Sequence, residues 1–228
     1  MYKYKIGIVD EDPCDMDFIE RTILENKPDN VQEEQIDFWR CPFPTESENV
    51  YDSVVKLIIE KITKEEIQAL IVDYKIIISA KSLEGAQIFK RLVEIVPKFP
   101  LVMLSNVPNE CYEKEFIDAD KVYSKKEFFK LEEDYSIEKV RNIFRNIDKY
   151  DSLRSKLSTQ LAAQLNRLES DEYSPEVLQS VIETEKLLDD FVPQQQTTVE
   201  KTLKVADLKN VVELLEEANK LIGGGDEN

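Results

Sequence analysis

ALIVDYKI, at residues 69–76, is the stretch that decides the fold. Its first four residues are apolar without interruption, and they end at a carboxylate, Asp73. Such a run is typical of a central parallel strand that is covered on both faces. Open α/β sheets carry their ligand chemistry at the carboxyl ends of the strands. We therefore expect Asp73 to lie at the edge of the sheet where chemistry takes place.

The same arrangement repeats on both sides of this stretch. Further strand-like runs lie at 4–9, 36–39, 100–104 and 121–124, and the last two lead directly into Ser105 and Lys125. Patterns of helical period separate the strands, at 13–24, 50–62, 84–96 and 109–117. Strands that alternate with helices imply right-handed crossovers. The sequence thus predicts an α/β fold with a doubly wound, five-stranded parallel sheet.

The C-terminal part has a helical pattern throughout. Ser136 is a suitable N-cap for one helix of roughly 33 residues. Ser174-Pro175 indicates the start of a second helix, 192–198 a polar connector, and 203–222 a third helix before a GlyGlyGly stop. We expect an α/β domain at 1–150 and an all-helical unit at 151–228.

A ladder of leucines from Leu153 to Leu168 leaves two interpretations open. It is either a coiled coil that dimerises the chain or a helix packed within its own three-helix unit. The spacing stays near four and does not alternate between three and four, which favours packing within the chain slightly.

Charge and composition exclude several classes of function. The net charge is −17, and residues 151–228 hold 8 basic and 16 acidic side chains, so nucleic acid is an unsuitable partner. No stretch approaches the length of a membrane span. Three separated cysteines (Cys14, Cys41 and Cys111) favour reduced thiols and a cytoplasmic setting. Because the chain has no histidine, it can use no histidine-based catalysis and cannot donate a phosphoryl group from histidine.

Five side chains fall at the carboxyl ends of different predicted strands: Asp10, Glu11, Asp73, Ser105 and Lys125. Three carboxylates in one pocket repel one another unless a hard cation that prefers oxygen ligands, Mg²⁺, neutralises them. An oxygen of Asp73 can then attack a phosphorus atom in line, while Lys125 and Ser105 bind the phosphoryl oxygens. The alternative is a purely structural role, in which Asp10, Glu11 and Asp73 only cap the helices that follow them.

At this point the chain resembles the response-regulator receiver family over residues 4–150. The resemblance rests on IGIVDEDP, ALIVDYKI, VMLSNVP and ADKVYSKKEF, in this order. It implies a flavodoxin-like receiver fold, with Asp10 and Glu11 binding Mg²⁺ and Asp73 accepting the phosphoryl group. It also implies that Ser105 and Lys125 bind the phosphoryl group, and that the backbone carbonyl of Lys75 is a further metal ligand.

Several features depart from the family's pattern. The stretches 11–73 and 73–85 are both longer than usual, which alters access to the pocket. Lys126 stands where the family has proline, Val122 replaces the switch aromatic, and Asn106 replaces a small residue. The conformational switch of the family is therefore expected to work differently in this chain.

These observations lead to three hypotheses about function. The first is a phosphorylation-dependent signalling protein: Asp73 is phosphorylated by a histidine kinase or phosphotransfer protein and controls a helical module, which binds a protein partner or self-associates. Apart from receiver-type self-phosphorylation and dephosphorylation, it would not be an enzyme. The second is a phosphorylation-independent pseudo-receiver that serves as a scaffold or adaptor. The third, an enzyme that uses the C-terminal unit, is the weakest, because no histidine, cysteine or phosphate-binding glycine loop occurs after residue 150.

Overall fold

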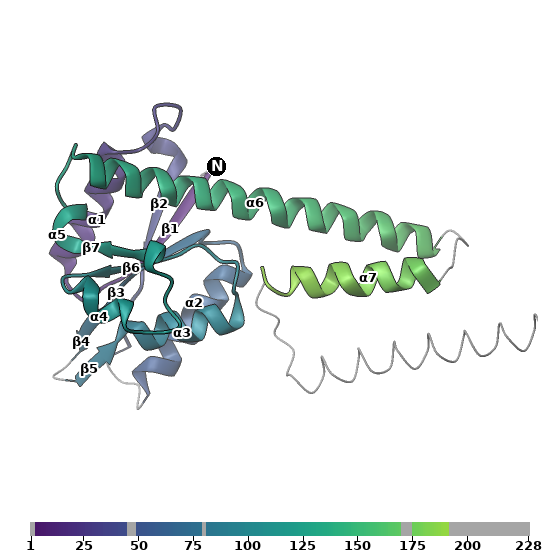
Figure 1. Cartoon of the computed structure of the whole chain (residues 1–228), viewed down its shortest axis with the longest axis horizontal. Coiled ribbons are helices and arrows are strands. Elements are labelled where there is room, and N and C mark those ends of the chain that lie inside the picture. The colour runs from purple at the N-terminus through teal and green to yellow at the C-terminus, as the bar shows by residue number, and fades with distance from the viewer. Residues whose placement is uncertain (1–2, 45–48, 79–80, 170–174, 192–228) are drawn as a thin grey trace, which may run out of the picture. The chain divides into compact units, whose positions relative to one another are not determined.

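The computed structural model describes residues 3–44, 49–78, 81–169 and 175–191 (Figure 1). The chain divides into two compact units. Unit 1 is Met1–Leu153 with Asp190–Pro193, and unit 2 is Arg154–Asp189 with Gln194–Asn228. Several predicted features lie outside the described residues: the 192–198 connector, the third helix at 203–222, the GlyGlyGly tail, Ser174 and part of the loop before residue 50.

Unit 1 is built on a parallel sheet of five strands, as the sequence predicts. The strand order is β2-β1-β3-β6-β7, which is flavodoxin-like. The strands are β1 (Tyr4–Val9), β2 (Ile36–Arg40), β3 (Ala69–Asp73), β6 (Leu101–Ser105) and β7 (Val122–Ser124). Every residue of β3 and β6 is buried, as expected of central strands. The prediction made from ALIV is confirmed.

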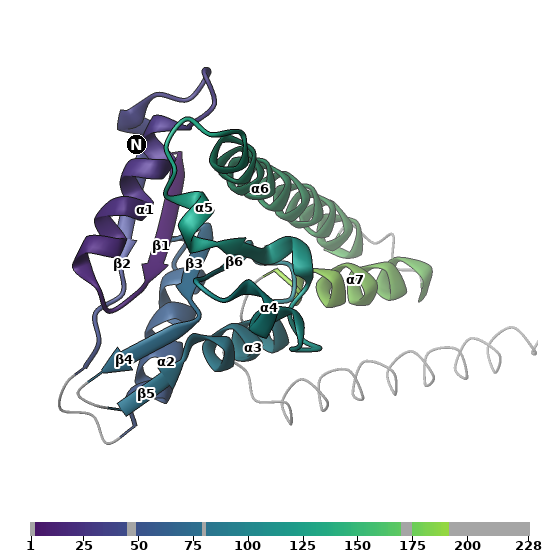
Figure 2. The ribbon, with the colours of Figure 1, turned by 60° about the vertical axis from the view of Figure 1, so that its left-hand side comes forward.

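One face of the sheet is covered by α1 (Pro13–Glu25) and by the first part of α6 (Asp134–Glu169). Asp12 caps α1 by accepting a hydrogen bond from the Cys14 amide, and Pro13 takes the first position, where no amide is needed. The core of this face joins apolar side chains from both helices and the sheet: Tyr4, Ile6, Ile8, Ile19, Ile23, Ile71, Leu104, Val140, Ile143, Phe144 and Ile147. Figure 2 shows α1 and α6 together above the strands.

The opposite face is covered by α2 (Val50–Thr63) and α3 (Gly85–Ile95), which pack against each other. Their buried positions follow the helical period that the sequence shows, with Val54, Ile58 and Ile62 on α2 and Ile88 and Leu92 on α3. Helices on both faces make the sheet doubly wound, as predicted.

Beyond β3 the sequence suggested an extended loop, and the structure instead places a hairpin there. Strands β4 (Lys75–Ile78) and β5 (Lys81–Glu84) pair antiparallel and form a separate two-stranded sheet (Figure 2). The residues that flank the hairpin lie close together, because the Gly85 amide donates a hydrogen bond to the Tyr74 carbonyl oxygen at 3.0 Å. The extra length therefore forms regular structure beside the site.

The predicted helix at 109–117 is shorter in the structure. Helix α4 covers only Pro108–Tyr112, and a 3₁₀ turn at Ala119–Lys121 leads into β7. Lys125, expected at the end of a strand, is the first residue of a short helix, α5 (Lys125–Phe128). All peptide bonds in the described residues are trans, including the one after Lys125.

The long helix expected from Ser136 is α6, a single helix of 36 residues that belongs to both units. It begins at Asp134, so Ser136 is not its N-cap. Ser136 lies in the first turn, where its hydroxyl donates to the carbonyl oxygens of Lys130 and Glu133. In unit 2, α6 is followed by α7 (Pro175–Leu188), and Gln160 Nε2 donates to Thr184 Oγ1 at 3.2 Å.

After α7 the chain rejoins unit 1. The Lys98 amide donates to the Asp190 carbonyl oxygen at 3.1 Å, and the Tyr150 hydroxyl donates to the carbonyl oxygen of Phe191. The rings of Tyr150 and Phe191 lie 5.5 Å apart, and Tyr150 also meets Phe99 edge-on. Residues 190 and 191 are therefore part of the α/β unit.

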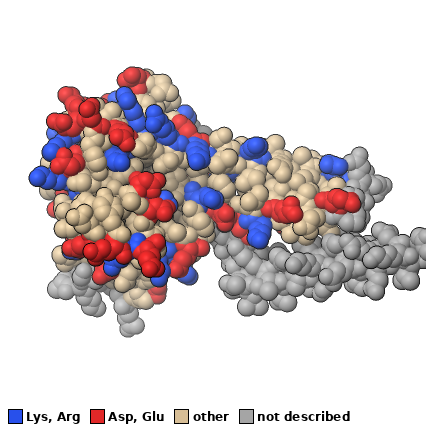
Figure 3. Space-filling model, in the orientation of Figure 1, with Lys and Arg blue, Asp and Glu red and all other residues tan. Residues whose placement is uncertain are grey.

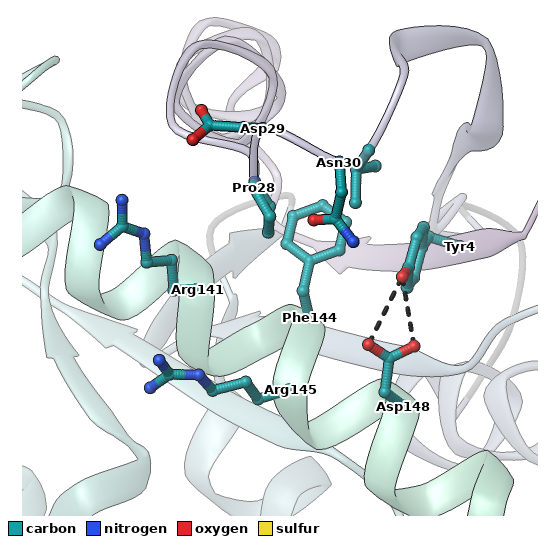
Figure 4. A pocket seen from close by; sticks show the side chains of 9 residues that line it. Tyr4, Pro28, Asp29, Asn30, Arg141, Phe144, Arg145 and Asp148 are labelled. Carbon is teal, nitrogen blue, oxygen red and sulfur yellow. Dashed lines mark hydrogen bonds between the residues drawn. The ribbon is translucent and has the colours of Figure 1, made fainter.

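Unit 1 also has a surface pocket of about 420 Å³ beside the start of β1 (Figure 4). Arg141, Phe144 and Arg145 line it from α6, and Asp29 and Asn30 from the loop after α1. At its rim the Tyr4 hydroxyl donates to both oxygens of Asp148, at 3.2 and 3.4 Å. This pocket lies at the amino end of β1, whereas Asp10 follows the carboxyl end of the same strand.

None of the helices in the described ranges has an apolar stretch long enough to cross a bilayer. Lys and Arg side chains are intermixed with Asp and Glu side chains on the face shown in Figure 3.

Candidate functional site

The candidate site lies at the carboxyl edge of the sheet in unit 1. Asp10 follows β1, Asp73 ends β3, Ser105 ends β6, and Lys125 follows β7. These four polar side chains are all buried, with no more than 8% of any residue exposed. Burial of four polar groups at one sheet edge is costly unless they bind one another or a ligand.

Lys125 is the centre of the site. Its ammonium lies 2.8 Å from Asp10 Oδ2, 2.7 Å from Asp73 Oδ1 and 2.6 Å from Asp15 Oδ2. A lysine has three N–H donors and no acceptor, so these three carboxylates account for all of them. The structure thus brings together three of the predicted residues and adds Asp15.

Backbone amides fix the remaining oxygens of two of these carboxylates. Asp10 Oδ1 accepts from the Asp12 amide, and Asp73 Oδ2 accepts from the Lys75 amide, each at 2.9 Å. Both bonds run from residue i+2 back to the side chain at i, which is the geometry of an Asx turn. Since Asp12 caps α1, helix capping does not explain Asp10.

Burial and the neighbouring charges shift the pKa of both central groups. Burial raises the pKa of Asp73 to about 6, against the lowering effect of the Lys125 ammonium. Burial also disfavours the charge on Lys125, but its hydrogen bonds to Asp10, Asp15 and Asp73 together raise its pKa above the ordinary value. At neutral pH an ionised Asp73 therefore faces a protonated Lys125.

Ser105 reaches the site from the next strand. Its Oγ accepts a hydrogen bond from the Val107 amide at 3.0 Å, and its side chain also hydrogen-bonds the Cys111 thiol. The thiol of Cys111, on α4, lies against Ser105, and burial raises the pKa of this thiol, which keeps it neutral. The negative charge of Asp73 also raises the pKa of this thiol.

Glu11 follows Asp10 at the same edge but binds none of the other site residues. Its Oε2 atom is buried and has no hydrogen-bond partner. Within the described ranges, no group of three or more acidic, Cys or His side chains is already arranged around a metal position. The donors nevertheless fit Mg²⁺ chemically, because Asp10, Asp73 and Glu11 offer only carboxylate oxygens and one of those oxygens is buried without a partner.

Lys75 links the site to the hairpin. Its amide donates to Asp73, and its ammonium forms an exposed ion pair with Glu110 Oε2 on α4 at 3.0 Å. Gly85 closes the hairpin against β3, since a Cβ atom at this position would lie 1.8 Å from the Asp73 carbonyl oxygen. The backbone of Asp73 is thus packed directly against the start of α3.

Sequence reasoning missed Asp15, which lies in the first turn of α1. It stands five residues after Asp10, and an acid in the first turn of a helix is common because it suits the helix dipole. Its place in the first turn of the helix after Asp10 was the only local signal, and nothing in the sequence pairs it with Lys125.

No family model matches the chain, and neither the curated proteins nor the solved structures that were compared with it give a match. The functional assignment therefore depends on the geometry of the site.

Proposed function

We propose that unit 1 is a receiver domain, in which Asp73 accepts a phosphoryl group from a histidine kinase or phosphotransfer protein. The observation that supports this most strongly is the contact of Lys125 with both Asp10 and Asp73, at the carboxyl edge of a sheet ordered β2-β1-β3-β6-β7. A structural ion pair alone gives no reason for a buried serine and an unpartnered glutamate oxygen at the same edge.

In the proposed reaction, one carboxylate oxygen of Asp73 attacks the phosphorus of the donor. A new O–P bond forms as the bond from phosphorus to the leaving group breaks, and the leaving group departs with the bonding electrons. Lys125 offsets the charge of the phosphoryl oxygens, and the Ser105 hydroxyl donates a hydrogen bond to one of them. The Asp73 pKa of about 6 leaves the nucleophile ionised at neutral pH.

Mg²⁺ would be held by Asp10, Glu11, Asp73 and the backbone carbonyl of Lys75, and it would supply positive charge to the phosphoryl oxygens. The residues of the chain would do the rest. The turns at Asp12 and Lys75 orient the carboxylates, and Lys125 provides the fixed charge beside Asp73.

The output of the proposed receiver is the helical part of the chain, acting through a protein partner or through self-association. Phosphorylation would shift an equilibrium between two states of the protein. Nucleic acid and membranes are not proposed as partners, because the chain carries 47 acidic against 30 basic side chains. The proposed setting is the cytoplasm, where the thiols of Cys14, Cys41 and Cys111 stay reduced.

The direct test is the intact mass of the protein after incubation with Mg²⁺ and a small acyl phosphate. The expected result is one phosphoryl adduct on the wild type and none on Asp73→Asn. Light scattering on the same samples tests self-association. If the wild type acquires no adduct under conditions that label an active receiver, the proposal is wrong.

One observation favours the second candidate, a pseudo-receiver scaffold. The β4–β5 hairpin begins two residues after Asp73, and Lys75 joins it to α4, so the surroundings of the phosphoacceptor are rebuilt. A scaffold of this kind binds its partners equally well when Asp73 is replaced by Asn. Partner binding by Asp73→Asn therefore separates the two candidates.

A further inference from the structure

We infer that Asp15 is a positioning residue for Lys125, which it holds from α1 while the other two carboxylates take part in phosphoryl transfer. The inference builds on the proposed function, because it assigns a part in that reaction to a residue outside the motifs described above. It depends on a contact between two side chains, Asp15 Oδ2 and Lys125 Nζ, 2.6 Å apart.

The three N–H groups of Lys125 match three carboxylates, Asp10, Asp15 and Asp73. When the phosphoryl group is on Asp73, the donor that pointed to Asp73 Oδ1 becomes available to a phosphoryl oxygen. The other two contacts then decide where the ammonium sits.

The two remaining carboxylates, Asp10 and Asp15, differ in their other partners. Asp10 already uses Oδ1 for the Asp12 amide and is a proposed cation ligand, so a bound cation competes with Lys125 for it. The only ion pair of Asp15 within the described residues is the one with Lys125. Asp15 is thus the partner of Lys125 that remains when Asp10 and Asp73 are engaged elsewhere.

Asp15 stands in the first turn of a helix that is capped by Asp12 and opened by Pro13. The side chain of Lys125 is 5% exposed and that of Asp15 is 30% exposed, so the contact closes the solvent side of a buried ammonium. A charge-assisted hydrogen bond that the ammonium donates to a carboxylate on a fixed helix keeps a flexible lysine in one rotamer, as a preorganised site requires.

The test uses the full chain and three variants. Asp15→Asn removes the charge with little change in size, and Asp15→Glu restores it. Glu25→Gln is the matched control, because Glu25 is an exposed acid on the same helix, about 15 Å further along its axis. Phosphorylation is followed by intact mass over a range of acyl phosphate concentrations with saturating Mg²⁺.

We expect Asp15→Asn to lower the maximal phosphorylation rate roughly tenfold, with the half-saturating donor concentration unchanged. Asp15→Glu should recover most of the rate, and Glu25→Gln should match the wild type. A residue that only stabilised α1 would not show this division between maximal rate and half-saturation, nor the recovery by glutamate.

A second measurement does not depend on phosphorylation. A lysine ammonium held by three carboxylates gives a slowly exchanging signal in a ¹⁵N spectrum, which Lys125→Arg assigns by removing it. We expect Asp15→Asn to broaden or remove this signal and Glu25→Gln to preserve it.

The two measurements separate the possible failures. Wild-type rates together with an unchanged ammonium signal in Asp15→Asn would overturn the inference, while the receiver proposal would stand. If the wild type is never phosphorylated, the receiver proposal is wrong. In that case the ammonium signal alone tests the role of Asp15. An unchanged signal in Asp15→Asn would overturn the inference that Asp15 positions Lys125.

Discussion

Lys125 and Asp73 are 52 positions apart in the sequence and form a buried ion pair, with 5% and 9% of their side chains exposed. The pair connects the residue after β7 to the last residue of β3, across the intervening strand β6. The loss of either partner of such a pair destabilises the fold, because the other partner is then a buried charge without a counter-charge.

Replacement of Lys125 by Met should lower the free energy of unfolding by about 3–5 kcal/mol, because Asp10 and Asp73 then repel each other without a counter-charge. Urea denaturation at pH 7 measures the change. Lys130→Met is the control: Lys130 pairs with Glu127 on the surface, and the variant should remain close to the wild type. Equal stability of the two variants would contradict the role assigned to Lys125.

The raised pKa of Asp73 predicts a pH dependence of stability. Its pKa is about 6 in the folded protein against an ordinary value of 3.8, so the folded state keeps the proton over a range where the unfolded state has lost it. The free energy of unfolding should therefore rise by about 1 kcal/mol as the pH falls from 7 to 5, relative to a protein without this group. The contribution is lost again as the pH rises through 6.

Asp73→Asn lacks this titration and serves as the reference. Free energies of unfolding for both proteins at pH 7, 6 and 5, without divalent ions, give the difference directly. We expect the wild type to become more stable relative to Asp73→Asn as the pH falls. If the difference in free energy of unfolding stays constant, or if Asp73→Asn becomes the relatively more stable protein, Asp73 is not the buried acid described here.

Two glycines offer a matched pair of substitutions. Gly85→Ala places a Cβ atom 1.8 Å from the backbone oxygen of Asp73, which cannot move without displacing β3. We expect a loss of at least about 2 kcal/mol of stability and a displacement of Asp73. Gly7→Ala meets the end of the flexible Leu70 side chain at 2.6 Å and should cost about 1 kcal/mol. Denaturation curves that rank the two in the opposite order would disprove this packing.

The contact of residues 190 and 191 with unit 1 predicts a local effect. Tyr150→Phe removes the hydroxyl that binds the Phe191 carbonyl oxygen and should cost about 1 kcal/mol. The Lys98 amide, which donates to Asp190, should then exchange its hydrogen faster. Tyr51→Phe is the control, since Tyr51 binds the Gln87 carbonyl oxygen on α3. Unchanged exchange at Lys98 in Tyr150→Phe would mean that the hydroxyl does not hold this segment.

The sequence was sufficient to predict the sheet and the positions of most site residues. Apolar runs such as 69–72 report burial on both faces, and strand ends follow from where the runs stop. Asp10, Asp73 and Lys125 could be expected together because parallel strands of one sheet end at one edge. These features depend on pattern and topology, which a sequence carries directly.

The features that sequence reasoning missed depend on particular side-chain contacts or on weak local signals. The sequence of the β4–β5 segment contains no Asn-Gly or Gly-Gly pair, and its run of isoleucines does not alternate with polar residues. Helix α6 begins two residues before Ser136, whose hydroxyl donates to the carbonyl oxygens of Lys130 and Glu133 and does not act as the N-cap. The contact of Asp15 with Lys125 joins a helix to a strand end 110 positions later, and no periodicity encodes it.

The hydrogen bond between the Gly85 amide and the Tyr74 carbonyl oxygen brings the two ends of the β4–β5 hairpin together. A segment whose ends meet can be lengthened, shortened or exchanged without moving β3 or α3, as long as its first and last residues are kept. The hairpin is therefore a natural grafting point, where a foreign loop or a reporter domain can be installed immediately beside Asp73 while the sheet retains its register.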